Sequence, residues 1–356
     1  MKNILYSLLK KFWGLKENYS YEVGQPKKIL VVRQHNQLGD LLASVSVFRA
    51  LKEKFPSAKV AVIVSPTNKN ALHKSKFIDE LFVFDKSKIF SFDYIKKMIH
   101  FLRKDYDLAI VPVTVSISFT SNLLCRVANA KIRIGPNSLS GKENLSAFFF
   151  DRRINLDWKK YPDANVSDFS LDLLRPFGIS TNDFGSEICY DEKDEQDAKE
   201  FLQSYTRKRG KIIGLHVGAG KPPNRWSFEN FIALINLLEE NYQPAIYLTG
   251  WPDDLEIIEI IQHNVSSETK LFWNKGIPEV AALIAKSDLF ITNDTGIMHV
   301  AGTTPTPQIS IFGPTNPFNW APIGEQKYFL RKSDLINDVT VEEVFSLCKI
   351  LLADKK

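Results

Sequence analysis

The sequence has 356 residues, a formal net charge of +5 and an apolar content of 44%. At roughly 100–200 residues per domain this length predicts two domains, and the composition excludes a largely disordered chain. Basic residues are scattered among acidic ones and no basic run is interleaved with aromatic residues, so we expect no nucleic-acid partner.

The three cysteines, Cys125, Cys189 and Cys348, lie far apart in the sequence. Their odd number and their spacing predict neither a disulfide framework nor a zinc site, which is typical of a cytoplasmic protein without a bound metal. No apolar run reaches the roughly 18–20 residues that span a bilayer. The N-terminus also lacks the clean apolar core of a secretion signal.

Residues 1–24 precede the first regular element and are basic. Apolar residues recur there at helical spacing, and they are Ile4, Leu5, Leu8, Leu9, Phe12 and Trp13. Lysines surround them at positions 2, 10, 11 and 16. Such a helix either packs on the protein's own surface or lies in a membrane interface. The cluster Phe148–Arg153 (FFFDRR) is a second candidate for membrane contact.

Residues 25–180 alternate between predicted strands and helices. The first strand, Lys28–Arg33, is a short β-branched run, and a polar loop with Gly39 leads into a predicted helix at Asp40–Lys54. The further predicted strands are Lys59–Val64, Leu81–Phe84, Leu108–Val113 and Lys131–Ile134. This alternation predicts a parallel sheet covered by helices on both faces.

The pattern weakens after about residue 137. Asp168–Phe177 has helical spacing and ends at Gly178, an expected C-cap. We place the connection between the two domains near Ile179–Ser186.

A second alternating series occupies residues 186–335. Its predicted strands are Lys211–Val217, Ala245–Thr249, Leu289–Asn293 and Gln308–Phe312. Its predicted helices are Phe228–Glu240, Asp253–Gln262, Pro278–Lys286 and Gly296–Gly302, and a final helix, Val341–Leu352, is expected within residues 340–356. The fold class is therefore α/β, with two doubly wound parallel sheets. Because ligands bind beyond the carboxyl ends of such strands, we expect loops of both domains to face one cleft.

The segment Asp294-Thr295-Gly296 turns directly from a strand into a helix. Small residues at such a turn leave backbone N–H groups open at the positive end of the helix, an arrangement that holds a pyrophosphate. His299 lies four residues beyond Thr295 on the same helix face. Taken singly, Asp294 is equally well explained as a helix cap and His299 as a core histidine.

A second small-residue loop, Gly313-Pro314-Thr315, follows the next strand and lies at the same sheet edge. The order NDTGIMHVAG, strand, FGPTNPFNWAP resembles the C-terminal signature of glycosyltransferase family 9, which includes the bacterial lipopolysaccharide heptosyltransferases. The runs ILVVR, GD and LKEKFP in residues 29–56, and HVGAG with RW in residues 216–226, resemble further family motifs. In this order the motifs cover residues 27–324.

The resemblance implies a GT-B fold, with an N-terminal acceptor domain, a C-terminal nucleotide-sugar domain and a cleft between them. It also implies that the final helix returns to the N-terminal domain. Members of the family are inverting, metal-independent enzymes without a cofactor that usually use ADP-heptose as donor. The implied acceptor is a cell-surface glycan or glycolipid, reached by peripheral contact with the cytoplasmic face of the inner membrane.

The family's catalytic carboxylate falls on Asp40, which would remove the proton from the attacking acceptor hydroxyl. The alternative is that Asp40 caps the helix that follows it. Gly39 beside it and Arg33 at the preceding strand end are candidates for the acceptor side, because Arg33 could meet an anionic acceptor.

The loop Gly218-Ala219-Gly220 follows a strand and could approach the nucleotide closely, because glycine removes side-chain bulk. Many family members carry a lysine where this chain has Asn224. Either Lys221 or Arg225 is expected to take its place on the donor phosphates.

Two other activities remain open at this point. One is a GT-B-like epimerase that acts on the sugar nucleotide alone, and the other is a non-catalytic nucleotide- or glycan-binding module. A Rossmann dehydrogenase and a P-loop kinase are disfavoured because their glycine-rich motifs are absent.

Overall fold

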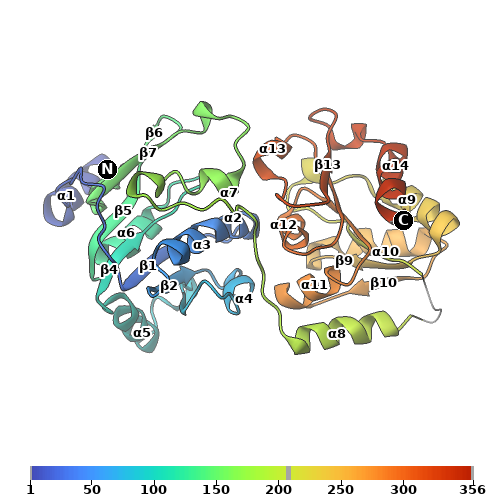
Figure 1. Ribbon diagram of the computed structural model, residues 1–356, viewed down its shortest axis with the longest axis horizontal. Coiled ribbons are helices and arrows are strands. Elements are labelled where there is room, and N and C mark those ends of the chain that lie inside the picture. Colours follow the sequence, from blue (N-terminus) through green and yellow to red (C-terminus); the bar gives the residue numbers. More distant parts are fainter. Residues whose placement is uncertain (1, 206–209, 354–356) are drawn as a thin grey trace. The chain divides into compact units, whose positions relative to one another are not determined.

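The computed structural model describes residues 2–205 and 210–353, with side chains from Tyr6 onward. The chain divides into two compact units, Met1–Phe184 and Gly185–Lys356. In Figure 1 the first unit runs from blue to green and the second from yellow-green to red. The division lies within the predicted connection, residues 179–186. Met1 and residues 354–356, at the ends of the predicted terminal segments, lie outside the described residues.

The N-terminal unit is built on a seven-stranded sheet of order β3-β2-β1-β4-β5-β6, in which β7 also pairs with β5. Its strands are β1 (Lys28–Arg33), β2 (Lys59–Val64), β3 (Glu80–Val83), β4 (Tyr106–Ile110), β5 (Ala130–Leu139), β6 (Lys142–Glu143) and β7 (Arg152–Leu156). Only the β5–β6 pair is antiparallel. The predicted parallel sheet is confirmed, and β1 and β2 have the predicted bounds.

The helices of this unit are α1 (Lys2–Trp13), α2 (Leu38–Ala43), α3 (Val45–Lys54), α4 (Lys69–Leu72), α5 (Phe92–Leu102), α6 (Phe119–Val127) and α7 (Val166–Phe169). Helices α2 to α6 connect consecutive strands of this unit, whereas α1 precedes β1 and α7 follows β7. Short 3-10 turns are η1 (Lys86–Lys88), η2 (Ala147–Phe149), η3 (Trp158–Lys160) and η4 (Arg175–Phe177).

Two helix predictions in this unit were wrong in extent. The helix predicted at Asp40–Lys54 is divided at Ser44, whose hydroxyl donates to the carbonyl of Asp40 (2.8 Å). Such side-chain bonds to the backbone interrupt a regular helix. The helix predicted at Asp168–Phe177 is replaced by α7 and η4, because Pro176 has no N–H to donate. Gly178 ends η4 in the left-handed conformation, as predicted.

Helix α1 docks on the N-terminal unit along one side. The ring of Tyr6 packs edge-on against Phe119 (5.6 Å between centroids) and Phe148 (6.5 Å). On another side, Leu8 and Phe12 are 51% and 75% exposed. Both interpretations of this helix thus retain support, because it packs on its own unit and still presents apolar side chains. Among the helices described, none is long and apolar enough to cross a bilayer.

The C-terminal unit is built on a six-stranded, wholly parallel sheet of order β10-β9-β8-β11-β12-β13. Its strands are β8 (Ile212–His216), β9 (Ala245–Thr249), β10 (Thr269–Phe272), β11 (Leu289–Asn293), β12 (Gln308–Ile311) and β13 (Lys327–Leu330). The sequence did not predict β10 and β13. Both are edge strands with mostly half-buried side chains, so they lack the apolar run that marks a central strand.

The helices of this unit cover both faces of the sheet. They are α8 (Glu192–Gln203), α9 (Phe228–Tyr242), α10 (Leu255–Asn264), α11 (Ile277–Ile284), α12 (Gly296–Gly302), α13 (Pro317–Trp320) and α14 (Val341–Leu352), with 3-10 turns η5 (Pro222–Asn224), η6 (Pro252–Asp254) and η7 (Ile336–Asp338). Helix α8 was not predicted. Only Asp194 and Ala198 of this helix are buried, so its apolar period is weak.

The last helix packs in the core of the C-terminal unit, and its expected return to the N-terminal domain stays a prediction. Val344, Cys348 and Leu352 of α14 are buried in the core of the C-terminal unit, together with residues of α9 and β11. The cause lies in the spacing, because these three residues form one apolar stripe at i, i+4 and i+8. Helix α14 is therefore part of the second unit.

The three cysteines occupy different environments. Burial raises the pKa of the Cys125 and Cys348 thiols to about 12. Cys189 is half-buried and lies five residues after the division between the units.

Removing part of the α14 stripe should destabilise the protein. We expect Leu352→Ala to lower the free energy of unfolding by about 2–5 kcal/mol, because it leaves a cavity in the core. Ile350→Ala is the matched control, since Ile350 is 70% exposed and should cost no more than about 0.5 kcal/mol. Urea denaturation measures both, and equal effects would contradict the assignment of α14 to this core.

Candidate functional site

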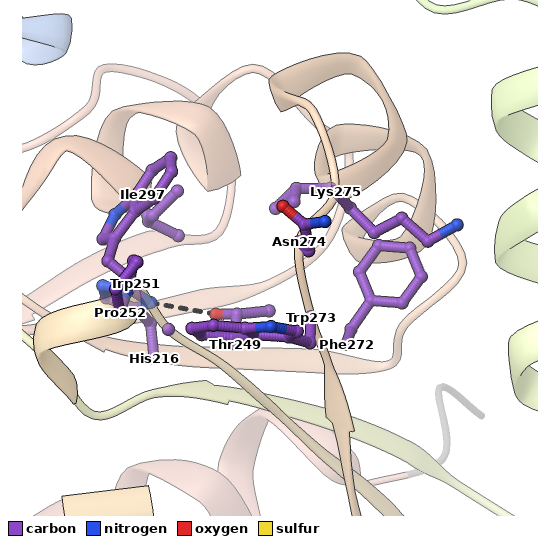
Figure 2. A pocket seen from close by; sticks show the side chains of 11 residues that line it. His216, Thr249, Trp251, Pro252, Phe272, Trp273, Asn274, Lys275 and Ile297 are labelled. Carbon is purple, nitrogen blue, oxygen red and sulfur yellow. Dashed lines mark hydrogen bonds between the residues drawn. The ribbon is translucent and has the colours of Figure 1, made fainter. Parts of the chain in front are cut away.

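A pocket lies at the carboxyl edge of the second sheet. It encloses about 190 Å³ and is bordered by residues at the ends of β8, β9 and β10. Its lining residues are His216, Thr249, Gly250, Trp251, Pro252, Phe272, Trp273, Asn274, Lys275, Val280 and Ile297. Figure 2 shows Trp251 and Ile297 on one side of this pocket and Asn274 and Lys275 on the other. Because Ile297 belongs to the first turn of α12, the pocket adjoins that helix.

His216 supplies the pocket with a polar atom that has no protein partner. Its Nδ1 lies 2.9 Å from the hydroxyl of Thr249, the contact drawn in Figure 2. Its Nε2 is buried and has no hydrogen-bond partner within the described part of the chain. Burial lowers the pKa of His216 to about 4, so the ring is neutral near pH 7. Buried polar atoms are normally paired, and an unpaired one in a pocket indicates a place for a ligand.

The turn between β11 and α12 is organised around Asp294. Asn224 donates to its carboxylate (2.8 Å), and the Thr315 side chain makes a second hydrogen bond to it. Burial raises the pKa of Asp294, while the bond from Thr315 and the charge of Lys221 act in the opposite direction. Segments far apart in the sequence therefore meet at one carboxylate. Asp294 is held within the protein by these bonds and does not cap α12, whose N-cap is Thr295.

The first turn of α12 presents the remaining residues predicted for the phosphate site. Thr295 is extended and its hydroxyl makes no capping bond to the helix, and Gly296 is the first helical residue. His299 is buried, and its ring lies edge-on to Trp320 with centroids 6.3 Å apart. Burial lowers the pKa of His299 to about 4.

The two glycines of the loop after β8 lie in different surroundings, and their predicted approach to a nucleotide stays a prediction. A Cβ on Gly218 would lie 2.2 Å from the carboxylate of Asp254, whereas one on Gly220 would meet nothing within 4 Å. The carbonyl of Ala219 accepts from the Nε of Arg225 (2.6 Å), whose guanidinium also lies 3.7 Å from Asp254. Arg225 is thus engaged within its own loop, and Lys221 is the exposed cation whose charge acts on Asp294.

The second predicted loop, Gly313-Pro314-Thr315, joins this cluster through Thr315 alone. The carbonyl of Gly313 accepts from Arg331 (2.7 Å), and a Cβ at Gly313 would lie 2.9 Å from Ile336. Pro314 is exposed. Gly313 therefore serves the close packing of the C-terminal segment.

In the N-terminal unit, Asp40 is paired with Arg33. Their side chains are both buried, and the guanidinium lies 3.7 Å from the carboxylate. Asp40 occupies the first turn of α2 next to Gly39, and the N-cap of α2 is Gln37. The helix-cap interpretation of Asp40 is thus wrong.

Arg33 is 2% exposed and its donors face the protein. It donates to the hydroxyls of Ser44 (3.1 Å) and Thr114 (3.3 Å) and to the carbonyl of Asp40 (3.0 Å), and it lies 2.9 Å from Nδ1 of His35. These bonds position the α2 turn that holds Asp40. The contact of Arg33 with an anionic acceptor, expected from the sequence, stays a prediction.

A cavity of about 420 Å³ lies at the carboxyl edge of the first sheet. It is lined by Gln34, His35, Asn36, Gln37, Pro66, Thr67, Phe84, Asp85, Lys86 and Ser118. Burial, then the charges of Arg33 and Lys86, lower the pKa of His35 to about 4. The cavity is polar and borders the same β1–α2 loop that leads to Asp40.

Sequence reasoning missed several residues that shape these sites. Asn293 donates to the carbonyls of Val217 (2.9 Å) and Gly218 (3.2 Å) and accepts from the N–H of Trp226 (3.1 Å). Trp251 and Trp273 line the pocket. Trp251 follows a predicted strand closely and could have been flagged by that position, whereas Trp273 follows β10, which had no clear signal.

Comparison with known proteins identifies the family. Residues 95–347 match the sequence model of the family described as glycosyltransferase family 9 (heptosyltransferase). The chain belongs to glycosyltransferase family 9. The motif containing Asp40 lies before the matched region, so its assignment depends on the resemblance and on the geometry described above. As a member of this family the chain is a glycosyltransferase.

Individual relatives agree with this assignment. The chain is 26% identical over 303 residues to lipopolysaccharide heptosyltransferase 3 of Escherichia coli, covering 80% of this chain and 83% of the relative. Among solved structures, a family 9 glycosyltransferase from Veillonella parvula has a TM-score of 0.78 at 20% identity and covers 96% and 99% of the two chains. The E. coli ADP-heptose lipopolysaccharide heptosyltransferase II has a TM-score of 0.76 at 21% identity, with 91% and 98% coverage. The two parallel-sheet units thus form a GT-B fold, as predicted.

The buried histidines should make stability depend on pH. His299 has a pKa of about 4 in the folded protein against 6.5 for an unperturbed histidine, so between these values the unfolded chain binds more protons. The free energy of unfolding should therefore fall as the pH drops from about 6.5 to about 4. We expect His299→Gln to reduce this slope by up to about 1.4 kcal/mol per pH unit.

Urea unfolding at several pH values measures the slope. His263→Gln is the matched control, because His263 is exposed on α10. A slope that is unchanged in His299→Gln, or reduced equally in the control, would contradict this account.

Proposed function

We propose that this glycosyltransferase transfers a heptose from ADP-heptose to a lipopolysaccharide or related cell-surface glycan, with inversion and without a metal. The observation that carries the proposal is the pocket of the C-terminal unit, where the unpaired Nε2 of His216 lies beside the first turn of α12. The names of the relatives, which are lipopolysaccharide heptosyltransferases, support the choice of donor and acceptor.

The donor would bind with its base and sugar in the aromatic pocket and its phosphates at the first turn of α12. Trp251 and Trp273 offer flat apolar surfaces to a base, and His216 offers one hydrogen bond. Backbone N–H groups at Thr295 and Gly296 and the ammonium of Lys221 are suited to phosphate oxygens. Asn224, which replaces the usual family lysine, already bonds to Asp294, so the positive charge would come from Lys221.

In the proposed reaction the acceptor hydroxyl attacks the anomeric carbon as the bond to ADP breaks. Asp40 takes the hydroxyl proton, and the negative charge leaves with the diphosphate. Inversion follows from a single displacement, in which the base acts on the face opposite the leaving group. The charge that develops on ADP is met by donors already fixed in place, which stabilise the transition state. Arg33 keeps the α2 turn in position through its bonds to Ser44 and Asp40.

The acceptor would occupy the polar cavity beside the β1–α2 loop. An acceptor anchored in lipid would place the enzyme at the cytoplasmic face of the inner membrane, as a peripheral protein.

Substitution of Asp40 should separate catalysis from donor binding. We expect Asp40→Asn to lower kcat by about 10²–10⁴-fold, because the base is lost, while ADP affinity is retained. Asp183→Asn is the control, since Asp183 is a largely exposed carboxylate of the same unit. Turnover with ADP-heptose and a truncated lipopolysaccharide acceptor measures the first effect. Full activity of Asp40→Asn would contradict the assignment, and donor isomerisation without acceptor would favour the epimerase.

Nucleotide calorimetry should locate the donor site. In the presence of EDTA we expect ADP to bind more tightly than UDP or GDP, and Lys221→Ala to weaken ADP binding by about tenfold or more, since a hydrogen bond to a charged group is lost. Lys349→Ala on the outer face of α14 is the matched control. Preference for UDP or GDP would reject ADP-heptose but not the transferase class. Binding that requires a divalent cation would reject metal independence.

A further inference from the structure

Three helices of the N-terminal unit form a continuous layer, which we call the basic helical layer: α1, α6 and α5. Arg126 of α6 donates to the carbonyl of Trp13 at the end of α1 (2.7 Å). The N–H of Asn129, just after α6, donates to the carbonyl of Leu102 at the end of α5 (2.8 Å). The connections β3 to β4 and β4 to β5 run in the same direction across the sheet. Right-handed crossovers therefore place α5 and α6 on the same face.

The basic helical layer carries charge almost entirely of one sign. Among the described side chains of its three helices, the basic ones are Lys10, Lys11, Lys96, Lys97 and Arg126, and Asp93 is the only acidic one. Lys86 and Lys88 of η1 lie just before α5, where Lys88 pairs with Asp85 (3.4 Å), and Arg103 and Asp105 lie just after α5. An anionic surface is the complement of such a layer.

Where α5 and α6 end, three arginines surround a cavity of about 440 Å³. Arg133 donates to the carbonyls of Cys125, Ala128 and Ala130, so its guanidinium is fixed inside the unit. Arg103 and Arg126 complete the cationic lining at the surface. This cavity extends the positive charge of the layer between two of its helices.

The same layer exposes large apolar side chains. Phe90 is 95% exposed and Phe92 is 81% exposed at the start of α5, and Phe12 is exposed on α1. Ile99 lies about two turns after Phe92 on the same face of α5 and is also exposed. The exposure of phenylalanine side chains to water is unfavourable. Exposed phenylalanines among lysines are typical of helices that lie in a membrane interface.

We propose that the basic helical layer docks on an anionic lipid bilayer, with Phe12, Phe90 and Phe92 entering the headgroup region. The lysines and arginines around them face the lipid phosphates. Lys86 belongs both to the edge of this layer and to the lining of the polar cavity assigned to the acceptor, so docking brings that cavity next to the lipid. The proposal deepens the proposed function, on which it rests for the lipid-anchored acceptor.

Vesicle co-sedimentation tests this surface. The full chain is mixed with phosphatidylcholine vesicles, with or without phosphatidylglycerol, in the absence of donor and acceptor. The test variants are Phe12→Ser/Phe92→Ser and Lys96→Glu/Lys97→Glu. The controls are Leu335→Ser/Ile350→Ser, which removes equally exposed apolar residues of the C-terminal unit, and Lys193→Glu/Lys199→Glu on α8.

We expect binding only to the vesicles that contain phosphatidylglycerol, decreasing with added salt. Each lysine near an anionic surface contributes on the order of fivefold to partitioning, so Lys96→Glu/Lys97→Glu should weaken binding by about 25-fold or more. Loss of the two phenylalanines should weaken it by about tenfold or more. Both control variants should bind as the unaltered chain does.

Absence of binding to anionic vesicles, or an equal loss of vesicle binding in test and control variants, would overturn the proposal. The basic helical layer would then be a surface for a protein partner. ADP calorimetry on the same variants keeps the two proposals apart. Retained ADP binding with failed vesicle binding rejects the membrane surface alone. Retained vesicle binding with absent ADP binding rejects the proposed donor site alone.

Discussion

The polar side chains at the end of β11 hold the loops of the C-terminal unit in their positions. The Asn293 side chain bonds to two carbonyls and one N–H of the segment after β8. The Asp294 carboxylate accepts hydrogen bonds from Asn224 and Thr315. Backbone groups of buried loops need partners as much as those of strands do. These two side chains therefore fix the loops after β8, β11 and β12 relative to one another.

In the N-terminal unit, a buried ion pair between Arg33 and Asp40 holds the loop after β1. Taking a guanidinium out of water is costly unless every donor is paired. Arg33 offsets this cost through bonds to Ser44, Thr114, Asp40 and His35, which connect the end of β1 to the first turn of α2. A carboxylate on such a support is held in one orientation, which general-base catalysis requires.

The sequence predicted best where burial is complete on both faces of a strand. β1, β2, β9 and β11 were found with their observed bounds because central parallel strands are unbroken apolar runs. The edge strands β10 and β13 bury too little apolar surface to give that signal. Because β10 was not predicted, Trp273, which follows it, could not be recognised as a residue at a strand end. The candidate site residues were proposed from motifs, but their hydrogen-bond partners could not be predicted. Whether Arg225 faces a ligand or the Ala219 carbonyl is decided by three-dimensional contacts that no spacing encodes.

The environments of the cysteines have a practical consequence. Only a thiolate reacts readily with alkylating reagents, and burial keeps Cys125 and Cys348 protonated and covered. Cys189, half-buried beside the division between the units, is the thiol that a maleimide dye would modify. The chain thus carries its own labelling position close to the division between the two units.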